Sequence, residues 1–199
     1  MPYRSPEISR HRPLDRLLAT IHESAQRFEG VYPGTKNWAY QTAFHLVLDL
    51  GRGFTATAPP AGLGRMPARE CYANAARYAL EHHSREGVIY VEGFASSDVF
   101  GGHLPLAHAW CVRPDGTVID PTWVDGLAYV GIPFAETRLW PVDGFGLLDY
   151  HKRLLPLLHH GIPEQVLADV GHPLPLLGPN DPAGPRQPGT VEQRTEAVR

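Results

Sequence analysis

The sequence predicts an α+β fold in which N-terminal helices precede an antiparallel β-sheet. Apolar residues recur at helical spacing over residues 14–28 and 37–50, and glycines follow both stretches. Residues 88–94 and 106–112 are instead rich in β-branched and aromatic side chains, which favour strands. Gly and Pro each occur 20 times in 199 residues, so turns are frequent and a simple helical bundle is disfavoured. The length fits one domain, since domains usually have about 100–200 residues.

A third helix is expected over residues 67–82, before the strands begin. Pro67 suits the first turn of a helix, and several alanines follow it. The tripeptide Pro114-Asp115-Gly116 predicts a tight turn after the strand at 106–112. Further elements are expected as strands at 117–119 and 129–134 and as helices at 147–158, which Pro156 should kink or end, and at 163–170.

The chain is expected to divide into one α+β domain, residues 1–171, and a C-terminal tail, residues 172–199. Six prolines punctuate the tail, which has few aromatic or β-branched residues. Such a segment buries too little apolar surface to fold by itself, so the tail is expected to be disordered.

Composition and charge restrict the class of function. The 18 basic and 21 acidic residues give a net charge of −3, which leaves no electrostatic footprint for nucleic acid or an anionic membrane. No run approaches the roughly 18 consecutive apolar residues of a membrane span, and the first twelve residues do not resemble a secretory signal. Two cysteines do not make a disulfide scaffold. A cytoplasmic protein with reduced thiols is expected.

Three residues have the chemistry of a catalytic triad: Cys71, His108 and Asp120. Cys71 falls in the first turn of the expected third helix, where unpaired N–H groups and the helix dipole favour the nucleophilic thiolate. His108 lies within one expected strand, and Asp120 ends the next. A cysteine nucleophile needs a base, and the base needs a group that holds its tautomer.

The turn at 114–116 decides whether His108 and Asp120 can meet. If Arg113 pairs with Thr117 across a three-residue loop, His108 and Asp120 are diagonal neighbours on one face of the sheet, about 7–8 Å apart. A two-residue loop would place them on opposite faces. The triad therefore requires the three-residue loop or a compensating bulge.

Three short motifs resemble the transglutaminase-like branch of the papain-like cysteine enzymes: Glu70-Cys71-Tyr72-Ala73-Asn74-Ala75, His108-Ala109-Trp110 and Ile119-Asp120-Pro121-Thr122-Trp123. The resemblance covers residues 67–134 and implies a papain-like or transglutaminase-like core. It implies that Cys71 attacks an amide or ester carbonyl to form a thioester, that His108 acts as base and then acid, and that Asp120 orients it. No metal or organic cofactor is implied, and the substrate would be a peptide, a protein or a small amide.

The resemblance also implies an oxyanion hole beside the triad. The Cys71 N–H would be one oxyanion donor. Asn37, Trp38 and Gln41 lie upstream, where papain-like enzymes often place a second donor, but the sequence assigns none of them. Asn74 is expected to bond only locally.

Three functions stay open at this point. Hydrolysis of an amide or peptide bond is the first, and transfer of the acyl group to an amine is the second. The same order of residues also resembles arylamine N-acetyltransferases and the proteases that remove leader peptides from lasso precursors, although the Arg-Gly-Gly that precedes the cysteine of the acetyltransferases is absent here. A non-catalytic binding module with the same fold is the third.

Other uses of these side chains are disfavoured. Cys111 alternates with His108 and Trp110 along its strand, so it should point to the opposite face and lie in the core. Trp110 and Trp123 are expected to pack around the site and shield it. A zinc site is disfavoured because no Cys-x-x-Cys or His-Glu-x-x-His motif is present.

Overall fold

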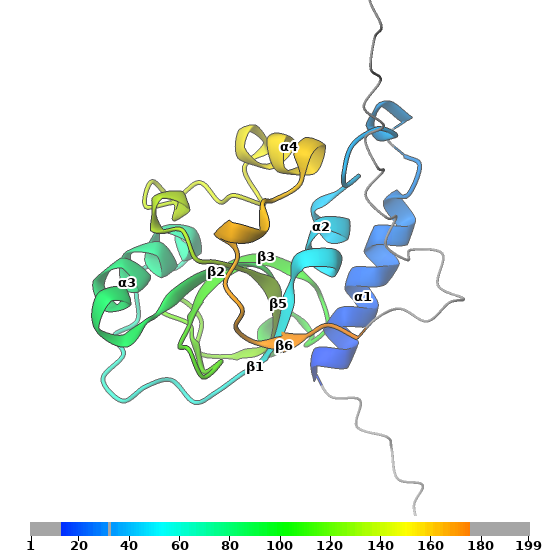
Figure 1. Cartoon of the computed structure of the whole chain (residues 1–199). Helices are drawn as coiled ribbons and strands as arrows, with labels where there is room; N and C mark the ends of the chain where they lie inside the picture. The colour runs from blue at the N-terminus through cyan, green and yellow to red at the C-terminus, as the bar shows by residue number, and fades with distance from the viewer. Residues whose placement is uncertain (1–12, 32, 176–199) are drawn as a thin grey trace, which may run out of the picture.

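A curved antiparallel sheet forms the centre of the protein in a computed structural model, which describes residues 13–31 and 33–175 (Figure 1). Within these residues, six strands are arranged in the order β4-β3-β2-β5-β1-β6. The helices are α1 (Pro13–Phe28), α2 (Ala43–Leu50), α3 (Cys71–Glu86) and α4 (His151–His160). The strands are β1 (Arg52–Thr55), β2 (Ile89–Ser97), β3 (Leu106–Val112), β4 (Val118–Ile119), β5 (Gly126–Phe134) and β6 (His172–Pro173). Short 3₁₀ helices occupy Pro33–Thr35, Asp98–Phe100, Thr137–Leu139 and Glu164–Val166.

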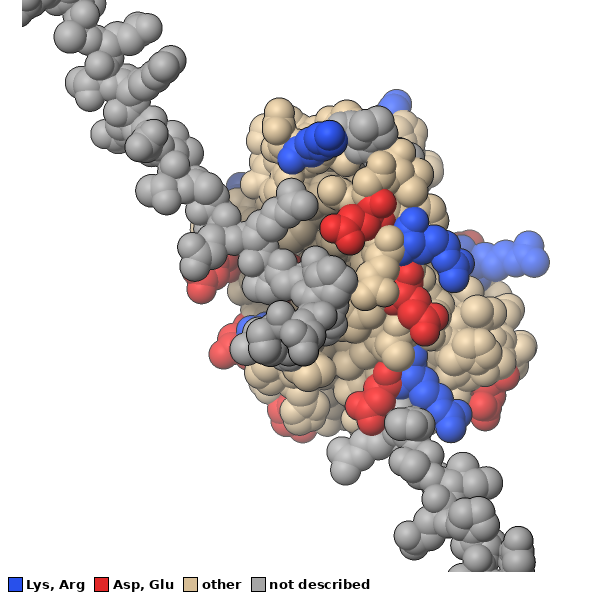
Figure 2. Space-filling model, turned by 90° about the vertical axis from the view of Figure 1, so that its right-hand side faces the viewer, with Lys and Arg blue, Asp and Glu red and all other residues tan. Residues whose placement is uncertain are grey.

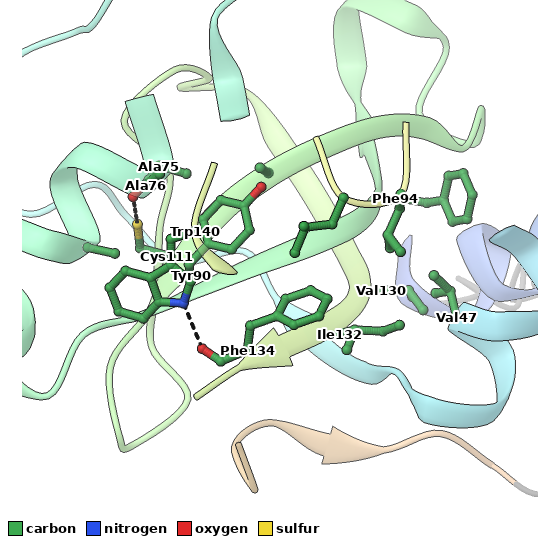
Figure 3. Packing of buried hydrophobic residues seen from close by; sticks show 14 of the residues in the cluster. Val47, Ala75, Ala76, Tyr90, Phe94, Cys111, Val130, Ile132, Phe134 and Trp140 are labelled. Atoms are coloured by element: carbon green, nitrogen blue, oxygen red, sulfur yellow. Dashed lines mark hydrogen bonds between the residues drawn. The ribbon is translucent and has the colours of Figure 1, made fainter. Parts of the chain in front are cut away.

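The α+β class expected from the sequence is confirmed. In Figure 1, α3 lies toward one end of the curved sheet and α1 and α2 lie toward the other, and all three helices pack on the same face of the sheet. The helix α3 packs on β3, and α1 packs on β5. One large apolar cluster joins these helices to the sheet, and Figure 3 shows part of it, with Tyr90, Cys111 and Phe134 among its members.

Small side chains let α3 approach β3 closely. Ala75, Ala76 and Ala79 of α3 are fully buried. The Cys111 thiol consequently donates to the Ala75 carbonyl at 3.1 Å (Figure 3). This confirms that Cys111 is a core residue.

The third helix begins four residues later than expected, at Cys71 rather than Pro67. The Pro67 carbonyl accepts a hydrogen bond from the Asn74 side chain at 2.7 Å, and the first backbone bond of the helix runs from the Asn74 N–H to Glu70. A side-chain bond thus holds residues 67–70 outside the helix, and Arg69 takes a φ of 68° there.

Several boundaries differ from those expected. The helix expected at 37–50 begins only at Ala43, because the Thr42 hydroxyl caps it. The strand β1 follows it directly, although Gly51 and Gly53 predict only the end of a helix in the sequence. Pro156 lies inside α4 and does not end it, and the segment expected as a helix at 163–170 forms only a short 3₁₀ turn.

The expected tail is wrong in its first residues. His172 and Pro173 form β6 and pair with Gly53 and Arg52 of β1. Disorder was expected from residue 172, but backbone pairing at the sheet edge orders this pair without a large apolar side chain. The rest of the tail from residue 176 lies outside the described residues.

The surface carries charges of both signs. Figure 2 shows acidic and basic side chains intermixed on the side of the molecule where α1 lies. Arg153 pairs with Asp143, and Arg52 pairs with Asp169. None of the helices in the described part of the chain is long and apolar enough to span a membrane.

Gly93 and Gly131 let β2 and β5 approach each other beside the strand that carries His108. The two glycines pair directly, and Gly93 also pairs with His108. A Cβ at Gly93 would lie 2.3 Å from the Val130 carbonyl oxygen and 2.4 Å from the Gly131 Cα, both backbone atoms that cannot rotate away.

We therefore expect Gly93→Ala to lower the free energy of unfolding by about 1–3 kcal/mol, the usual cost of overpacking. Gly64→Ala is the matched control, because nothing lies within 4 Å of a Cβ built there. Denaturant unfolding of both variants measures the difference, and equal stabilities would contradict the close approach.

Candidate active site

Cys71 is the first residue of α3, and its free thiol is partly exposed. The backbone N–H groups of the first helical turn, together with the helix dipole, place partial positive charge near the sulfur. The preceding residue, Glu70, makes no side-chain cap to these groups. The expected position of Cys71 in the first turn is therefore what the structure has, although the helix itself starts later.

His108 and Asp120 form a buried hydrogen-bonded pair. The His108 Nε2 lies 2.7 Å from the Asp120 Oδ2, and the imidazole is 1 % exposed. Because Nε2 faces the carboxylate, Nδ1 is the ring nitrogen that remains for a second partner.

The hairpin between β3 and β4 has the three-residue loop that the triad requires. Cys111 pairs with Ile119, and the Arg113 N–H donates to the Thr117 carbonyl at 3.0 Å. With this register, His108 and Asp120 lie on one face of the sheet, and Cys111 lies on the other.

Four donors fix the Asp120 carboxylate. In addition to His108, the Tyr129 hydroxyl donates to Oδ2 at 3.1 Å, and the N–H groups of Thr122 and Trp123 donate to Oδ1 at 2.9 and 2.8 Å. These bonds hold the carboxylate in one orientation. Residues 120–123 therefore form an Asx-type turn.

Tyr129, which is buried on β5, was not among the site residues expected from the sequence. Gly126 makes room for its hydroxyl, because a Cβ at that position would overlap the phenol oxygen. Burial raises the pKa of Tyr129, and the neighbouring Asp120 charge raises it further, so the phenol stays a neutral donor. The only signal in the sequence was a tyrosine in an expected strand, which is too common to identify a site residue.

The environment of His108 favours its protonated form. Burial alone lowers the pKa of the imidazole, but the hydrogen bond to Asp120 and the interaction with Cys71 outweigh burial and raise the pKa to about 9. Cys71 thus acts on the same imidazole that Asp120 holds. The three residues expected from the sequence are brought together.

Trp123 covers the imidazole. Its ring stacks on His108 with 3.8 Å between centroids and 17° between planes, while the Trp110 ring lies 6.4 Å away. Both tryptophans therefore pack around the site as expected. Phe100 lies 6.2 Å from Trp123 and, like its neighbour Val99, is exposed. Apolar surface thus continues from the imidazole to solvent.

Asn74 joins the nucleophile helix to the segment that carries Asp120. It is fully buried, and its Nδ2 donates to the Thr122 hydroxyl at 3.1 Å as well as to Pro67. The Met66 N–H also donates to the Pro121 carbonyl at 2.9 Å. The expectation that Asn74 bonds only locally is wrong, because this contact spans 48 residues.

Two of the three upstream residues considered as oxyanion donors have other contacts. The Gln41 side-chain oxygen accepts from the Gly30 N–H, and Trp38 packs against His159 of α4. In the described part of the chain, no three His, Cys, Asp or Glu side chains are grouped so that they could hold a metal ion.

The protonation of His108 should contribute to stability in a defined pH range. The folded-state pKa is about 9 against an ordinary value of 6.5, so the contribution is complete below pH 6.5 and is lost as the pH rises through 9. We expect the stability advantage of the wild type over His108→Gln to shrink by about 3 kcal/mol across this interval.

Denaturant unfolding of both proteins at several pH values measures this advantage. Asp120→Asn serves as a second comparison, since it removes the charge that holds the imidazole proton. An advantage that stays constant from pH 6 to pH 10 would show that folding does not raise the pKa of His108.

Comparisons of the chain with protein-family models, with curated proteins and with solved structures returned no match.

Proposed function

We propose that this protein is a cysteine-dependent acyl-transfer enzyme that hydrolyses an amide or peptide bond through a thioester intermediate. The observation that carries the proposal is the buried His108–Asp120 pair, whose imidazole also interacts with the thiol at the start of α3. A buried charged pair beside a partly exposed thiol is costly for folding, and perturbed groups of this kind are typical of catalytic sites.

The proposed reaction starts from a Cys71 thiolate and a His108 imidazolium. The sulfur attacks the carbonyl carbon, and the carbonyl electrons move to oxygen. The C–N bond then breaks, the leaving nitrogen takes the proton from His108, and a thioester remains on Cys71. Water attacks the thioester while His108 takes one of its protons. Collapse expels the sulfur and releases the carboxylic acid, which restores the starting pair.

Neighbouring groups have supporting roles in this proposal. Asp120 holds the imidazole in one orientation and balances its charge during the reaction. The Cys71 backbone N–H at the start of α3 is the proposed first oxyanion donor. Trp123 excludes water from one face of the imidazole, which strengthens its bond to Asp120.

The chain is proposed to belong with the transglutaminase-like enzymes on the order Cys71, His108, Asp120 and on the short motifs around them. A helix that presents the cysteine and a β-hairpin that presents the other two residues are consistent with this proposal. Both cysteines are free, so a reducing compartment such as the cytoplasm would keep the nucleophile active.

Removal of the nucleophile should abolish the activity without unfolding the protein. We expect Cys71→Ala to reduce turnover at least 1,000-fold, because no other described thiol faces His108. Cys111→Ala is the control, since Cys111 lies on the opposite face of the sheet. Release of an amine from peptide-amide libraries measures turnover, and circular dichroism checks the fold.

Alkylation provides a test that needs no substrate. We expect iodoacetamide to label Cys71 of the wild type at pH 6–7 at least tenfold faster than Cys71 of His108→Ala, because the imidazolium stabilises the attacking thiolate. Equal rates in the two proteins would mean that the imidazole does not activate the sulfur, and the binding-module interpretation would then be favoured.

The products distinguish hydrolysis from acyl transfer. We expect mass spectrometry to show the free acid as the main product even when a primary amine is added, because water can deacylate a thioester at a partly exposed cysteine. A main product that contains the added amine would instead identify an acyltransferase or transglutaminase.

A further inference from the structure

Glu92 is a buried carboxylate that the proposed mechanism does not use. It lies in the middle of β2, is 1 % exposed and points to the face opposite His108, because its neighbour Gly93 is the residue that pairs with His108. Glu92 makes no ion pair with any described residue. A buried carboxylate without a cation is expensive, so its retention requires specific hydrogen bonds.

Three donors satisfy this carboxylate, and two of them belong to one backbone segment. The Leu147 N–H donates to Oε2 at 2.8 Å, and the Leu148 N–H donates to Oε1 at 2.6 Å. The Tyr90 hydroxyl, on the same strand and face, donates to Oε2 at 2.6 Å. Glu92 therefore binds the segment that precedes α4 to the sheet.

This segment, residues 144–149, lies against the first turn of α3. A Cβ at Gly146 would lie 2.5 Å from the Glu92 Oε1 and 2.7 Å from the Tyr72 ring, so Gly146 fits between the two side chains. Asp149 interacts with the Tyr72 hydroxyl. Tyr72 directly follows Cys71 in the chain, so the segment contacts the residue next to the nucleophile.

We propose that Glu92 is a positioning residue for Cys71, because it fixes residues 144–149 against Tyr72 and so holds the first turn of α3 in place. The inference rests on the proposed function of Cys71. Asn74 ties the same turn to Thr122 on the Asp120 side. The nucleophile is thus held between two independent sets of hydrogen bonds, one from each flank.

The attachment of residues 144–149 to Glu92 depends on pH, because Glu92 can be protonated. Burial raises the pKa of Glu92 to about 7, although its bonds to Tyr90 and to the two backbone N–H groups oppose the shift. The other titratable groups that face it are Tyr72 of α3 and Asp149, and burial raises the pKa of both Tyr72 and Tyr90, which stay neutral.

The direction of this pH effect follows from the difference between the pKa of Glu92 in the attached and in the detached state. When the segment detaches, Glu92 becomes solvated and returns to its ordinary pKa of 4.5. Raising the pH from 4.5 to 7 therefore favours detachment, by up to about 300-fold for a shift of this size, and the effect levels off above pH 7.

Hydrogen exchange of the Leu147 and Leu148 amides tests, without any substrate, whether Glu92 holds residues 144–149. We call this contact of Glu92 with the two amides the anchor. After correction for the intrinsic rate, we expect their protection in the wild type to fall between pH 5 and pH 7. Glu92→Gln should remove this pH dependence. Glu86→Gln, a variant of an exposed carboxylate paired with Arg113, should behave as the wild type does.

The effect on Cys71 is measured in the same proteins by iodoacetamide labelling at pH 7. We expect Glu92→Gln and Tyr90→Phe to slow labelling at least threefold. Glutamine replaces one accepting oxygen with an NH2 group, which cannot accept the backbone N–H that it faces, and Tyr90→Phe removes the donor to Oε2. In either variant a displaced first turn weakens the interaction of the sulfur with His108. Gly146→Ala should have the same effect, since its Cβ displaces the segment while Glu92 is unchanged. Gly146→Ala therefore also tests the positioning role if Glu92→Gln does not fold.

The outcomes separate the two proposals. Unchanged protection of both amides in Glu92→Gln would overturn the anchor. Lost protection with unchanged labelling of Cys71 would overturn the positioning role and leave Glu92 a structural residue. If His108→Ala labels as fast as the wild type, the proposed function fails, whereas the amide measurements still report on the anchor.

Discussion

The site depends on one hydrogen bond, between the His108 imidazole and the Asp120 carboxylate. Both groups are removed from water, so the bond is strong and the loss of either partner leaves an unpaired buried group. The surrounding residues hold both partners of this bond in place. Tyr129 and two backbone N–H groups hold the carboxylate, and Trp123 covers the ring.

The sequence predicted the fold best where local signals were strong. The strand at Leu106–Val112 has the expected bounds, and a turn forms at Pro114-Asp115-Gly116 as expected, because glycine and proline favour a tight turn. The sequence left the length of this turn open between two and three residues. The three candidate site residues were singled out because each residue type has a specific chemical role, and the structure brings them together. Helix starts were less predictable, because side-chain bonds such as that of Asn74 to Pro67 decide them.

The residues that the sequence did not reveal act through contacts between distant segments. Tyr129 reaches Asp120 from a strand on the far side of β2 and β3, and Asn74 reaches Thr122 across 48 residues. Glu92 is similar, because its backbone donors follow it by 55 and 56 residues. Tertiary contacts of this kind leave no periodic pattern in the chain. They require coordinates, although a glutamate within an apolar strand is itself an unusual feature.

The outermost strands of the sheet, β4 and β6, contain only two residues each. An edge strand exposes unpaired N–H and C=O groups on which another chain can add, and short edges limit this. In β6 one of the two residues is Pro173, which has no N–H to donate. Each edge strand pairs with only two residues of its neighbour, β4 with Cys111 and Val112 of β3 and β6 with Arg52 and Gly53 of β1. The edge strands themselves thus offer little backbone to another chain, and one of them, β4, leads directly into Asp120.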